Sequence, residues 1–443
     1  MHRTNLSQYL LKQLHQHQPS RLVLAYSGGL DSQVLLHLLW PLCQQHAIPL
    51  QVVHVHHGLS PQADAWARFC QKQCQQLNLP FELCHVHLPS NTNIEQQARR
   101  ARYQVLADYI TEPQTSLVCA HHADDQFETL LLALKRGAGL NGLAAMPSRR
   151  NFAKGQLWRP LLAISRQQLV DYATSHALSW VEDESNQNTE FERNFVRHTV
   201  SPVLKQRWPQ WLSTVGRSVQ HLQDAASLAE YYTEQALARC ATPDKLDLIA
   251  LSQQHPLQQD LVLRSWLYAA GFNPDTQWLL TLKQQVIAAQ ADAQPQLVAG
   301  RLLVRRYQQH LYLLNNDSQR KFLPSCVLTW QQACQLPEDR GQLLWHKTKV
   351  AGALALAEAS QQYQVVFGML NLPFKPAGKQ TKPLKQWFKQ WQLPPWQRGQ
   401  IPLLLHEGKL VLVAGYASSY SDEQAKAWLS WQPAKNELPF LAT

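Results

Sequence analysis

Residues 27–32 read SGGLDS, and they lie between the apolar run RLVLAY (residues 21–26) and the amphipathic run QVLLHLL (residues 33–39). This order predicts a β-strand, a tight turn and the first turn of a helix. In such a turn the unpaired backbone N–H groups and the helix dipole point at the same place, so an anion can bind there. Gly28 and Gly29 would let the main chain come close to a phosphate. The stretch therefore predicts a phosphate-binding loop.

The side chains of this stretch extend the prediction. Ser27 and Ser32 can donate hydroxyl hydrogen bonds to a phosphate. Asp31 would repel a phosphate unless a cation lay between them, so we expect it to hold Mg²⁺. The chain contains no G-x-x-x-x-G-K-[ST] pattern, which excludes the Walker type of loop. An ordinary βα turn without a ligand is the alternative interpretation.

Short apolar runs alternate with helical patterns from residue 21 to about residue 135. This alternation is typical of parallel βαβ units, so we predict a doubly wound α/β sheet with helices on both faces. Ligands bind at the carboxyl ends of the strands in such sheets. The loop, HVHHG (residues 54–58) and AHHADD (residues 120–125) all follow predicted strands. We therefore expect the three stretches to form one site.

The pattern changes after residue 215. Helical periodicity extends over residues 216–290, and RLLVRRYQQHLYLLN (residues 301–315) predicts two strands about a short turn. The last hundred residues combine strand-like runs with Pro, Trp and Lys, which indicates a small mixed α/β module. We predict an α/β domain (1–215), a helical domain ending in a β-hairpin (216–318), a linker region (319–350) and a basic C-terminal domain (351–443).

The composition indicates a polyanionic partner. The formal net charge is +10, and residues 320–443 carry 14 basic against 7 acidic side chains, which favours nucleic acid. No run approaches the roughly 18 apolar residues of a spanning helix, and the N-terminus lacks the apolar core of a signal peptide, so we expect a cytoplasmic protein without a membrane partner. The eight cysteines should then stay reduced, mostly as buried hydrophobes. Only Cys70 and Cys74 lie one helical turn apart, which is too little for a zinc site.

Residues 27–32 resemble the pyrophosphate loop of the ATP pyrophosphatases, which adenylate a carbonyl oxygen. Further runs follow one another in the order found in tRNA(Ile)-lysidine synthetases. These runs are VHVHHGLSPQAD (53–64), NIEQQARRARY (93–103), AHHADDQFETLLLALKRGAGLNGLAAM (120–146), RPLL (159–162), WVEDESNQNTEFERNFVR (180–197) and LKQWFKQWQLPPWQRGQIPLL (384–404). The resemblance spans all three predicted domains, so it is far more specific than the loop alone.

The resemblance implies an enzyme that uses ATP and Mg²⁺. ATP would adenylate the C2 carbonyl of the cytidine at the first anticodon position of a minor isoleucine tRNA with the anticodon CAU. The ε-amine of free lysine would then displace AMP and leave lysidine. The nucleotide would bind residues 27–32, including Leu30, together with His57 and Gly58. One position departs from the family, which generally has arginine where this chain has Ser60; Arg68 is a candidate for that role.

Cations suit this chemistry, because the triphosphate and the leaving pyrophosphate carry negative charge. We expect Mg²⁺ on Asp31 and the side chains of Arg99, Arg102 and Arg136 to neutralise that charge. Arg99 and Arg102 lie at i and i+3 on one helical face, and by themselves they would indicate a solvated basic stripe.

Acidic residues follow in the run from residue 120. Asp124, Asp125 and Glu128 can hold a metal or the ammonium of lysine, and one of them can accept the proton of the attacking amine. Asp124 is also a predicted Mg²⁺ ligand, and it can converge with Glu128, one turn away, on one cation. Helix capping is the alternative. His121 and His122 should point to opposite faces of a strand, one to a hydrogen bond and the other into packing.

The run at residues 180–197 predicts a polar loop leading into a helix. By itself it reads as a surface loop with capping residues. The resemblance implies that it contacts the nucleotide or the anticodon stem, through Asp183, Ser185, Asn186, Arg193, Asn194 and Arg197.

A basic and aromatic tract lies near the C-terminus. Residues 371–398 contain six basic residues, five aromatic residues and no acidic residue. Lysines supply phosphate contacts and exposed aromatics can stack on bases, which predicts RNA binding, and the resemblance implies that the RNA is tRNA. Trp387 and Trp391, one helical turn apart, are expected in the domain's own core. The predicted phosphate contacts are Lys379, Lys382, Lys385 and Arg398.

Other functions remain as alternatives. A tRNA cytidine thiolase would need paired C-x-x-C cysteines, and a glutamine-dependent amidotransferase would need a glutaminase domain; neither is found in the sequence. A non-catalytic RNA-binding protein would not need the intact SGGLDS or the three carboxylates. The oligomeric state stays open, with a homodimer among the options.

Overall fold

The computed structural model describes residues 5–86, 94–290, 293–316, 323–357 and 362–433. The chain forms two compact units, Met1–Tyr232 and Thr233–Thr443. No helix of the described residues is long and apolar enough to cross a membrane. Each unit is described by itself below.

The first unit is built on a six-stranded sheet with the order β3-β2-β1-β4-β6-β5. Its strands are β1 (Arg21–Ala25), β2 (Leu50–His56), β3 (Phe81–His85), β4 (Thr115–Val118), β5 (Arg149–Phe152) and β6 (Gly155–Trp158). All neighbours are parallel except β5, which is antiparallel to β6. The strand order reverses between β1 and β4, which is where doubly wound sheets bind ligands. The predicted doubly wound sheet is thus confirmed.

Helices cover both faces of this sheet. The helices of the unit before α10 are α1 (Leu6–His17), α2 (Leu30–Gln45), α3 (Ala63–Gln76), α4 (Ile94–Ala107), α5 (Ala123–Lys135), α6 (Leu140–Leu143), α7 (Arg166–Ser175), α8 (Glu192–Phe195) and α9 (Ser201–Arg207), with a 3₁₀ turn at Glu184–Gln187 and a π-helical segment at Val196–Val200. In β1, Leu22 and Leu24 belong to the core cluster shared with α1 and α2, whereas Val23 belongs to the cluster that contains Leu106 of α4. The strand is apolar throughout because both of its faces are buried.

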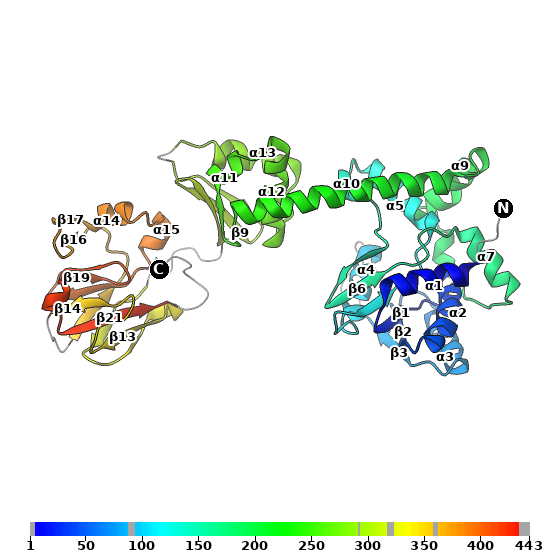
Figure 1. The fold of residues 1–443 in the computed structure, drawn as a ribbon, viewed down its shortest axis with the longest axis horizontal. Helices are drawn as coiled ribbons and strands as arrows, with labels where there is room; N and C mark the ends of the chain where they lie inside the picture. The colour runs from blue at the N-terminus through cyan, green and yellow to red at the C-terminus, as the bar shows by residue number, and fades with distance from the viewer. Residues whose placement is uncertain (1–4, 87–93, 291–292, 317–322, 358–361, 434–443) are drawn as a thin grey trace. The chain divides into compact units, whose positions relative to one another are not determined.

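The long helix α10 (Trp211–Cys240) begins in the first unit and ends in the second; it is the long green helix in Figure 1. The predicted domain boundary at residues 215–216 therefore falls inside one helix. Hydrophobic periodicity alone does not mark a boundary there, because a helix that runs on keeps its periodicity.

The second unit begins with a helical part that packs on a four-stranded sheet of order β7-β10-β9-β8. Strands β9 and β10 pair antiparallel about a two-residue turn, Tyr307 opposite His310. The elements are β7 (Lys245–Asp247), α11 (Leu248–Ser252), α12 (Pro256–Ala269), α13 (Thr276–Thr281), a π-helical segment (Leu282–Ile287), β8 (Gln296–Ala299), β9 (Leu302–Tyr307) and β10 (His310–Asn315).

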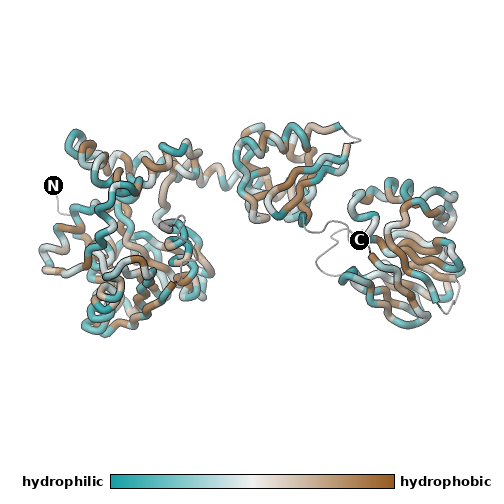
Figure 2. Tube along the Cα trace, turned by 180° about the vertical axis from the view of Figure 1, so that it is seen from behind, coloured by the Kyte–Doolittle hydropathy of each residue, from teal (hydrophilic) through white to brown (hydrophobic). Residues whose placement is uncertain are grey.

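The C-terminal part holds two antiparallel sheets, of order β11-β15-β18-β19-β20 and β12-β13-β21-β14, and a two-stranded sheet of β16 and β17. Its hydrophobic segments gather in the strands (Figure 2). The elements are β11 (Cys326–Thr329), β12 (Cys334–Gln335), β13 (Gln342–His346), β14 (Leu354–Leu356), β15 (Gln362–Val366), β16 (Pro373–Phe374), β17 (Lys382–Pro383), α14 (Leu384–Gln390), α15 (Pro395–Arg398), β18 (Leu403–His406), β19 (Lys409–Val413), β20 (Ala417–Ser418) and β21 (Ala427–Gln432), with 3₁₀ turns at Pro337–Asp339 and Asp422–Gln424.

The region predicted as a linker, residues 319–350, differs from that expectation. Three of the strands just given, β11, β12 and β13, lie within it. β11 pairs with β15 and β13 pairs with β21, both from much later in the chain, and β12 pairs with β13. These strands are short, and their partners are distant in sequence, so local patterning does not reveal them. Residues 317–322, which include the start of the predicted linker, lie outside the described residues.

Candidate active site

The SGGLDS loop joins β1 to α2, as the sequence predicts. Gly29 is the N-cap of α2, and no side chain caps this end of the helix. The two serines bind the loop itself: the hydroxyl of Ser32 donates to the carbonyl of Gly29 (3.0 Å), and the Ser27 hydroxyl lies 3.0 Å from that of Ser32. No capping side chain accepts a hydrogen bond from the first N–H groups of α2, so these groups are available to an anion.

Gly28 is fixed by its surroundings. Its φ is +80°, and a Cβ there would lie 2.7 Å from Sγ of Cys70 on α3. The backbone N–H of Val181 donates to the carbonyl of Gly28 (3.0 Å), so the 180–197 segment braces the loop. Gly29 differs, because its φ is −72° and a Cβ there would meet nothing closer than 3.5 Å. The fold itself requires glycine only at position 28 of the pair.

His122 lies among three carboxylates. The expectation that His121 and His122 lie in a strand is wrong, because β4 ends at Val118 and His122 is the N-cap of α5. Its imidazole is 1% exposed, and its nitrogens lie 3.5 Å from Asp31, 3.7 Å from Asp124 and 3.4 Å from Asp125. Burial by itself would lower the pKa of His122, but these three negative charges outweigh burial and raise it. The sequence predicted a hydrogen-bonding histidine here, but not that one imidazole would join the loop to the start of α5.

Asp124 and Asp125 occupy the first turn of α5. Asp124 accepts a hydrogen bond from the N–H of Arg166 (2.8 Å) and forms an ion pair with Lys205 of α9. Asp125 accepts from the N–H of His122 (3.0 Å) and completes a capping box. Burial would raise the pKa of Asp125, but the charges of His122 and Arg193 lower it to about 2, so it is ionised.

Glu128 is fully buried and is held by two arginines. Nε of Arg193 donates to Oε2 (2.8 Å), and Arg197 donates through Nε to Oε1 (2.8 Å) and through Nη2 to Oε2 (3.0 Å). Both arginines also reach Oδ1 of Asp125, at 3.4 and 3.2 Å. The spacing of Asp124 and Glu128 predicted that they converge on one cation, but in the structure they do not. Each carboxylate has its own partners, because the α8 segment brings two guanidinium groups to Glu128.

Asp31 is the carboxylate best placed for Mg²⁺. Its Oδ1 is buried without a hydrogen-bond partner among the described residues. The described residues contain no group of three His, Cys, Asp or Glu side chains that could hold a metal. Mg²⁺ is commonly held by one or two carboxylates together with substrate phosphates, so a single carboxylate such as Asp31 suits it. Both oxygens of Asp124, the other predicted ligand, already have partners, so Asp31 fits the ion and Asp124 fits it less well.

A cationic region lies on the other side of the end of β4. The guanidinium carbons of Arg99 and Arg102, on α4, lie 5.1 and 5.8 Å from the centre of the Tyr103 ring. Burial lowers the pKa of His57 to about 4, with the charge of Arg102 adding to the effect. Burial likewise lowers the pKa of His121 to about 3, although Asp125 opposes the change. Both imidazoles are therefore neutral at neutral pH.

Arg136 is not brought to this site. It is the C-cap of α5, twelve residues after Asp124, and it is exposed. At 1.5 Å per residue the two lie about 18 Å apart along the helix. The expectation that Arg136 neutralises the triphosphate is thus not supported by the structure, because the helix carries the residue away from the strand ends.

The polar segment before α8 is held in place by Asn194. This side chain is buried, and its amide donates to the carbonyls of Ser185 (3.0 Å) and Asn188 (2.9 Å). Asp183 caps the 3₁₀ turn by accepting from the N–H of Ser185 (2.9 Å), and the carbonyl of Asn186 lies 2.8 Å from the His198 ring. Asn194 and Asp183 thus position the loop through bonds within the chain.

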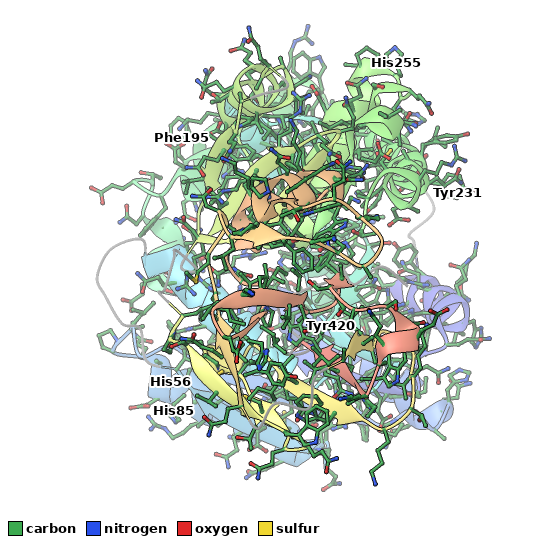
Figure 3. All side chains as sticks on the ribbon, turned by 90° about the vertical axis from the view of Figure 1, so that its left-hand side faces the viewer. His56, His85, Phe195, Tyr231, His255 and Tyr420 are labelled. Carbon is green, nitrogen blue, oxygen red and sulfur yellow. The ribbon has the colours of Figure 1, made fainter. Side chains whose placement is uncertain are left out.

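Two histidines lie beside the nucleotide side of the sheet without forming a metal site. His56 and His85, at the ends of β2 and β3, have ring centres 4.7 Å apart (Figure 3). His56 also lies 3.1 Å from Asp64 of α3, and Gly58 adopts a φ of +66°. Cys70 and Cys74 are fully buried in the core, as expected for structural cysteines.

The basic tract of the second unit surrounds a buried tryptophan. Trp387 is in the core and its indole N–H donates to the carbonyl of Phe374 (3.0 Å). The ammonium groups of Lys379 and Lys382 lie 5.5 and 5.1 Å from the centre of its ring. Lys385 is exposed at the start of α14. Arg398 differs from these lysines, because its Nε donates to the carbonyl of Leu393 (2.9 Å).

Sequence reasoning missed two cations of the site, Lys205 and Arg159. Lys205 lies in α9, far in sequence from its partner Asp124. Arg159, the first residue of the RPLL run, follows β6 directly and is 3% exposed. The signal for Arg159 was its place at a strand end, the rule that identified the other stretches.

Family models and relatives match nearly the whole chain. A PP-loop domain matches residues 2–204, a TilS substrate binding domain matches residues 246–312, and a TilS substrate C-terminal domain matches residues 364–431. The chain is 39% identical over 401 residues to the tRNA(Ile)-lysidine synthase of Coxiella burnetii, covering 90% of this chain and 89% of the relative. It is 37% identical to the tRNA(Ile)-lysidine synthase of Vibrio cholerae, covering 92% and 93%.

A solved structure, the U34-tRNA thiolase from Methanococcus maripaludis, aligns with 49% of this chain and 78% of its own. The TM-score is 0.40 and the identity 17%, which is too distant to bear on function.

Proposed function

This chain belongs to the tRNA(Ile)-lysidine synthase family, and we propose that it joins free L-lysine to C2 of the cytidine at the first anticodon position of tRNA(Ile) with the anticodon CAU. The proposal rests on the similarity to two such synthases, which are 39% and 37% identical to this chain over 90% and 92% of its length. The PP-loop domain binds ATP, and the two TilS domains match regions that bind the tRNA substrate.

The reaction needs activation because the oxygen on C2 of cytosine is a poor leaving group. The C2 oxygen attacks the α-phosphorus of ATP, and pyrophosphate leaves. The ε-amine of lysine then attacks C2, AMP leaves with the oxygen, and the amine loses a proton. Both leaving groups are anions, so preorganised donors and cations accelerate both steps.

The loop of residues 27–32 holds the phosphates. The N–H groups at the start of α2 have no side-chain cap, and the closely packed Gly28 holds the turn in shape. When bound at the free oxygen of Asp31, Mg²⁺ supplies positive charge to the phosphates. His57 and Gly58, after β2, border the same strand ends and contact the nucleotide.

We expect the ammonium of lysine to bind Asp124. There it would take the place of the ammonium group of Lys205, which is the present partner of Oδ1. Both oxygens of Glu128 bind Arg193 and Arg197, so Glu128 acts by holding these arginines rather than by binding lysine. The paired arginines, with Asp183 and Asn186 of the adjoining loop, face the RNA side of the reaction.

Contacts to tRNA phosphates come from Lys379, Lys382 and Lys385, which have no carboxylate partner among the described residues. Arg398 binds a backbone carbonyl through Nε, so its contribution to the RNA contact is smaller.

One experiment separates this function from its alternatives. The protein is incubated with ATP, radiolabelled lysine and tRNA(Ile) bearing CAU, and the label in RNA is counted. We expect incorporation that requires ATP and the CAU anticodon, and a loss of at least a hundredfold in Asp31→Asn. Asp64→Asn, a change of another carboxylate beside β2, serves as the control. Parental activity in Asp31→Asn would overturn the role of the loop, and no incorporation by the parent would overturn the function.

A further inference from the structure

Arg159 is a buried cation without a carboxylate. Its side chain is 3% exposed, and no carboxylate of the described residues lies within ion-pair distance of it. Nη1 donates to the carbonyl of Pro147 (2.8 Å), but Nε is buried with no hydrogen-bond partner there. A guanidinium stays charged in a protein, and a buried charge that is neither paired nor fully hydrogen-bonded is costly. Such a group indicates a missing anion.

The position of Arg159 relates it to the site. β6 pairs in parallel with β4, with Val118 opposite Trp158, and the N–H of Cys119 donates to the carbonyl of Trp158 (3.0 Å). Arg159 therefore emerges at the carboxyl edge of the sheet, beside the end of β4. The loop lies at the end of β1, on the opposite side of β4.

Other cations gather at the same place. Burial raises the pKa of the Cys119 thiol, and the charges of Arg102, Arg159 and Arg99 partly oppose that rise. The charges of Arg159 and Arg99 also act on His121, whose Nδ1 is buried without a partner among the described residues. Two arginines of α4, Arg99 and Arg102, and Arg159, which follows β6, thus contribute positive charge near the end of β4.

Both kinds of charge lie beyond the end of β4. The nitrogens of His122 lie within 3.7 Å of carboxylate oxygens of Asp31, Asp124 and Asp125. Its neighbour His121 is affected by the charge of Asp125 and by those of Arg159 and Arg99. These arginines supply the positive charge that an anion would need at this edge of the sheet.

We propose that Arg159, with Arg99 and Arg102, forms an oxyanion-binding subsite that takes an anionic group of a substrate, a phosphate of ATP or the α-carboxylate of lysine. The planar fork of a guanidinium matches either group with two parallel hydrogen bonds. The inference rests on the proposed function for the identity of the substrates.

The test compares Arg159→Gln and Arg159→Lys with Arg150→Gln. Arg150 is the matched control, because its guanidinium also lies near the Tyr103 ring (5.9 Å) but is exposed on β5. KM is measured for ATP, for lysine and for lysinamide, which keeps the ε-amine but lacks the carboxylate. Binding of pyrophosphate, which needs no turnover, is measured by calorimetry.

A carboxylate subsite predicts that Arg159→Gln raises KM for lysine at least about tenfold and leaves KM for lysinamide unchanged. A phosphate subsite predicts instead that Arg159→Gln lowers the affinity for pyrophosphate and raises KM for ATP by that factor. Arg159→Lys keeps the charge but loses the planar fork, so its KM values and pyrophosphate affinity should lie between those of the parent and of Arg159→Gln. If Arg159→Gln does not fold, Arg159→Lys is compared with the parent instead. Unchanged values in the folded variants, matching Arg150→Gln, would overturn the inference. A parent that makes no lysidine but loses pyrophosphate affinity on mutation would overturn the proposed function alone.

Discussion

A Cβ on Gly28 would lie 2.7 Å from Sγ of Cys70, so the turn after β1 packs directly against α3. Cys70 is itself fully buried, so its side chain cannot move away without disturbing the core. The shape of the phosphate loop thus depends on a contact with a residue more than forty positions later in the chain.

This contact predicts different effects at the two glycines. Gly28→Ala should destabilise the first unit by about 1–3 kcal/mol, because it combines a positive φ with overlap in a packed core. Gly29→Ala should leave stability within about 1 kcal/mol but raise KM for ATP about tenfold, because the methyl group would meet the phosphate. Urea unfolding and ATP kinetics measure the two effects. Equal stability losses would contradict the assignment.

Glu128 should matter to stability far more than an exposed glutamate of the same region. Glu128→Gln leaves two arginines beside Asp125 without their main partner, and it should lower the free energy of unfolding by about 2–4 kcal/mol. Glu192→Gln is the control, because the Lys135–Glu192 pair is 58% and 60% exposed and should contribute about 0.5 kcal/mol or less. Urea unfolding measures both, and similar values for the two variants would count against a buried network.

The lysine tract should control tRNA affinity. Changing Lys379, Lys382 and Lys385 together to alanine should raise KM for tRNA and reduce the slope of log affinity against log salt by about 2 to 3, because each phosphate contact releases a counterion. KM for ATP should not change. A triple alanine change at Lys12, Lys72 and Lys154, exposed residues of the first unit, removes the same charge and should keep the slope. Equal slopes in both triple variants would refute the assignment.

Lowering the pH should reduce the free energy of unfolding, because His57 is neutral in the folded protein and must take up a proton. Its folded pKa of about 4 lies below the unfolded value near 6.5, so the unfolded chain takes up the proton first. The contribution is therefore complete above pH 6.5 and is lost as pH falls toward 4, by an amount on the order of 1 kcal/mol because solvent screens this partly exposed ring. Urea unfolding at pH 7.5 and pH 4.5 should show a smaller loss in His57→Gln than in the parent. His221→Gln, at an exposed histidine of α10, should match the parent.

The features that depend on near neighbours could be predicted from the sequence. The order of strand, Gly-Gly turn and helix placed residues 27–32 at the N-terminus of α2. The βαβ pattern identified the parallel sheet and hence its carboxyl edge as the site. These features follow from backbone periodicity, which a few adjacent residues establish.

The pairing of charges could not be predicted in this way. The sequence marked Glu128, Arg193 and Arg197 separately, but only folding brings residues 65 and 69 positions apart into one ion cluster. The same holds for Lys205 on Asp124, for the unpaired Arg159, and for the distance that separates Arg136 from the loop. Sequence by itself determined the strand and helix on either side of the phosphate loop, and the chemistry of that loop. The tertiary structure decided which charges meet, because electrostatic partners depend on distance in space and not on separation along the chain.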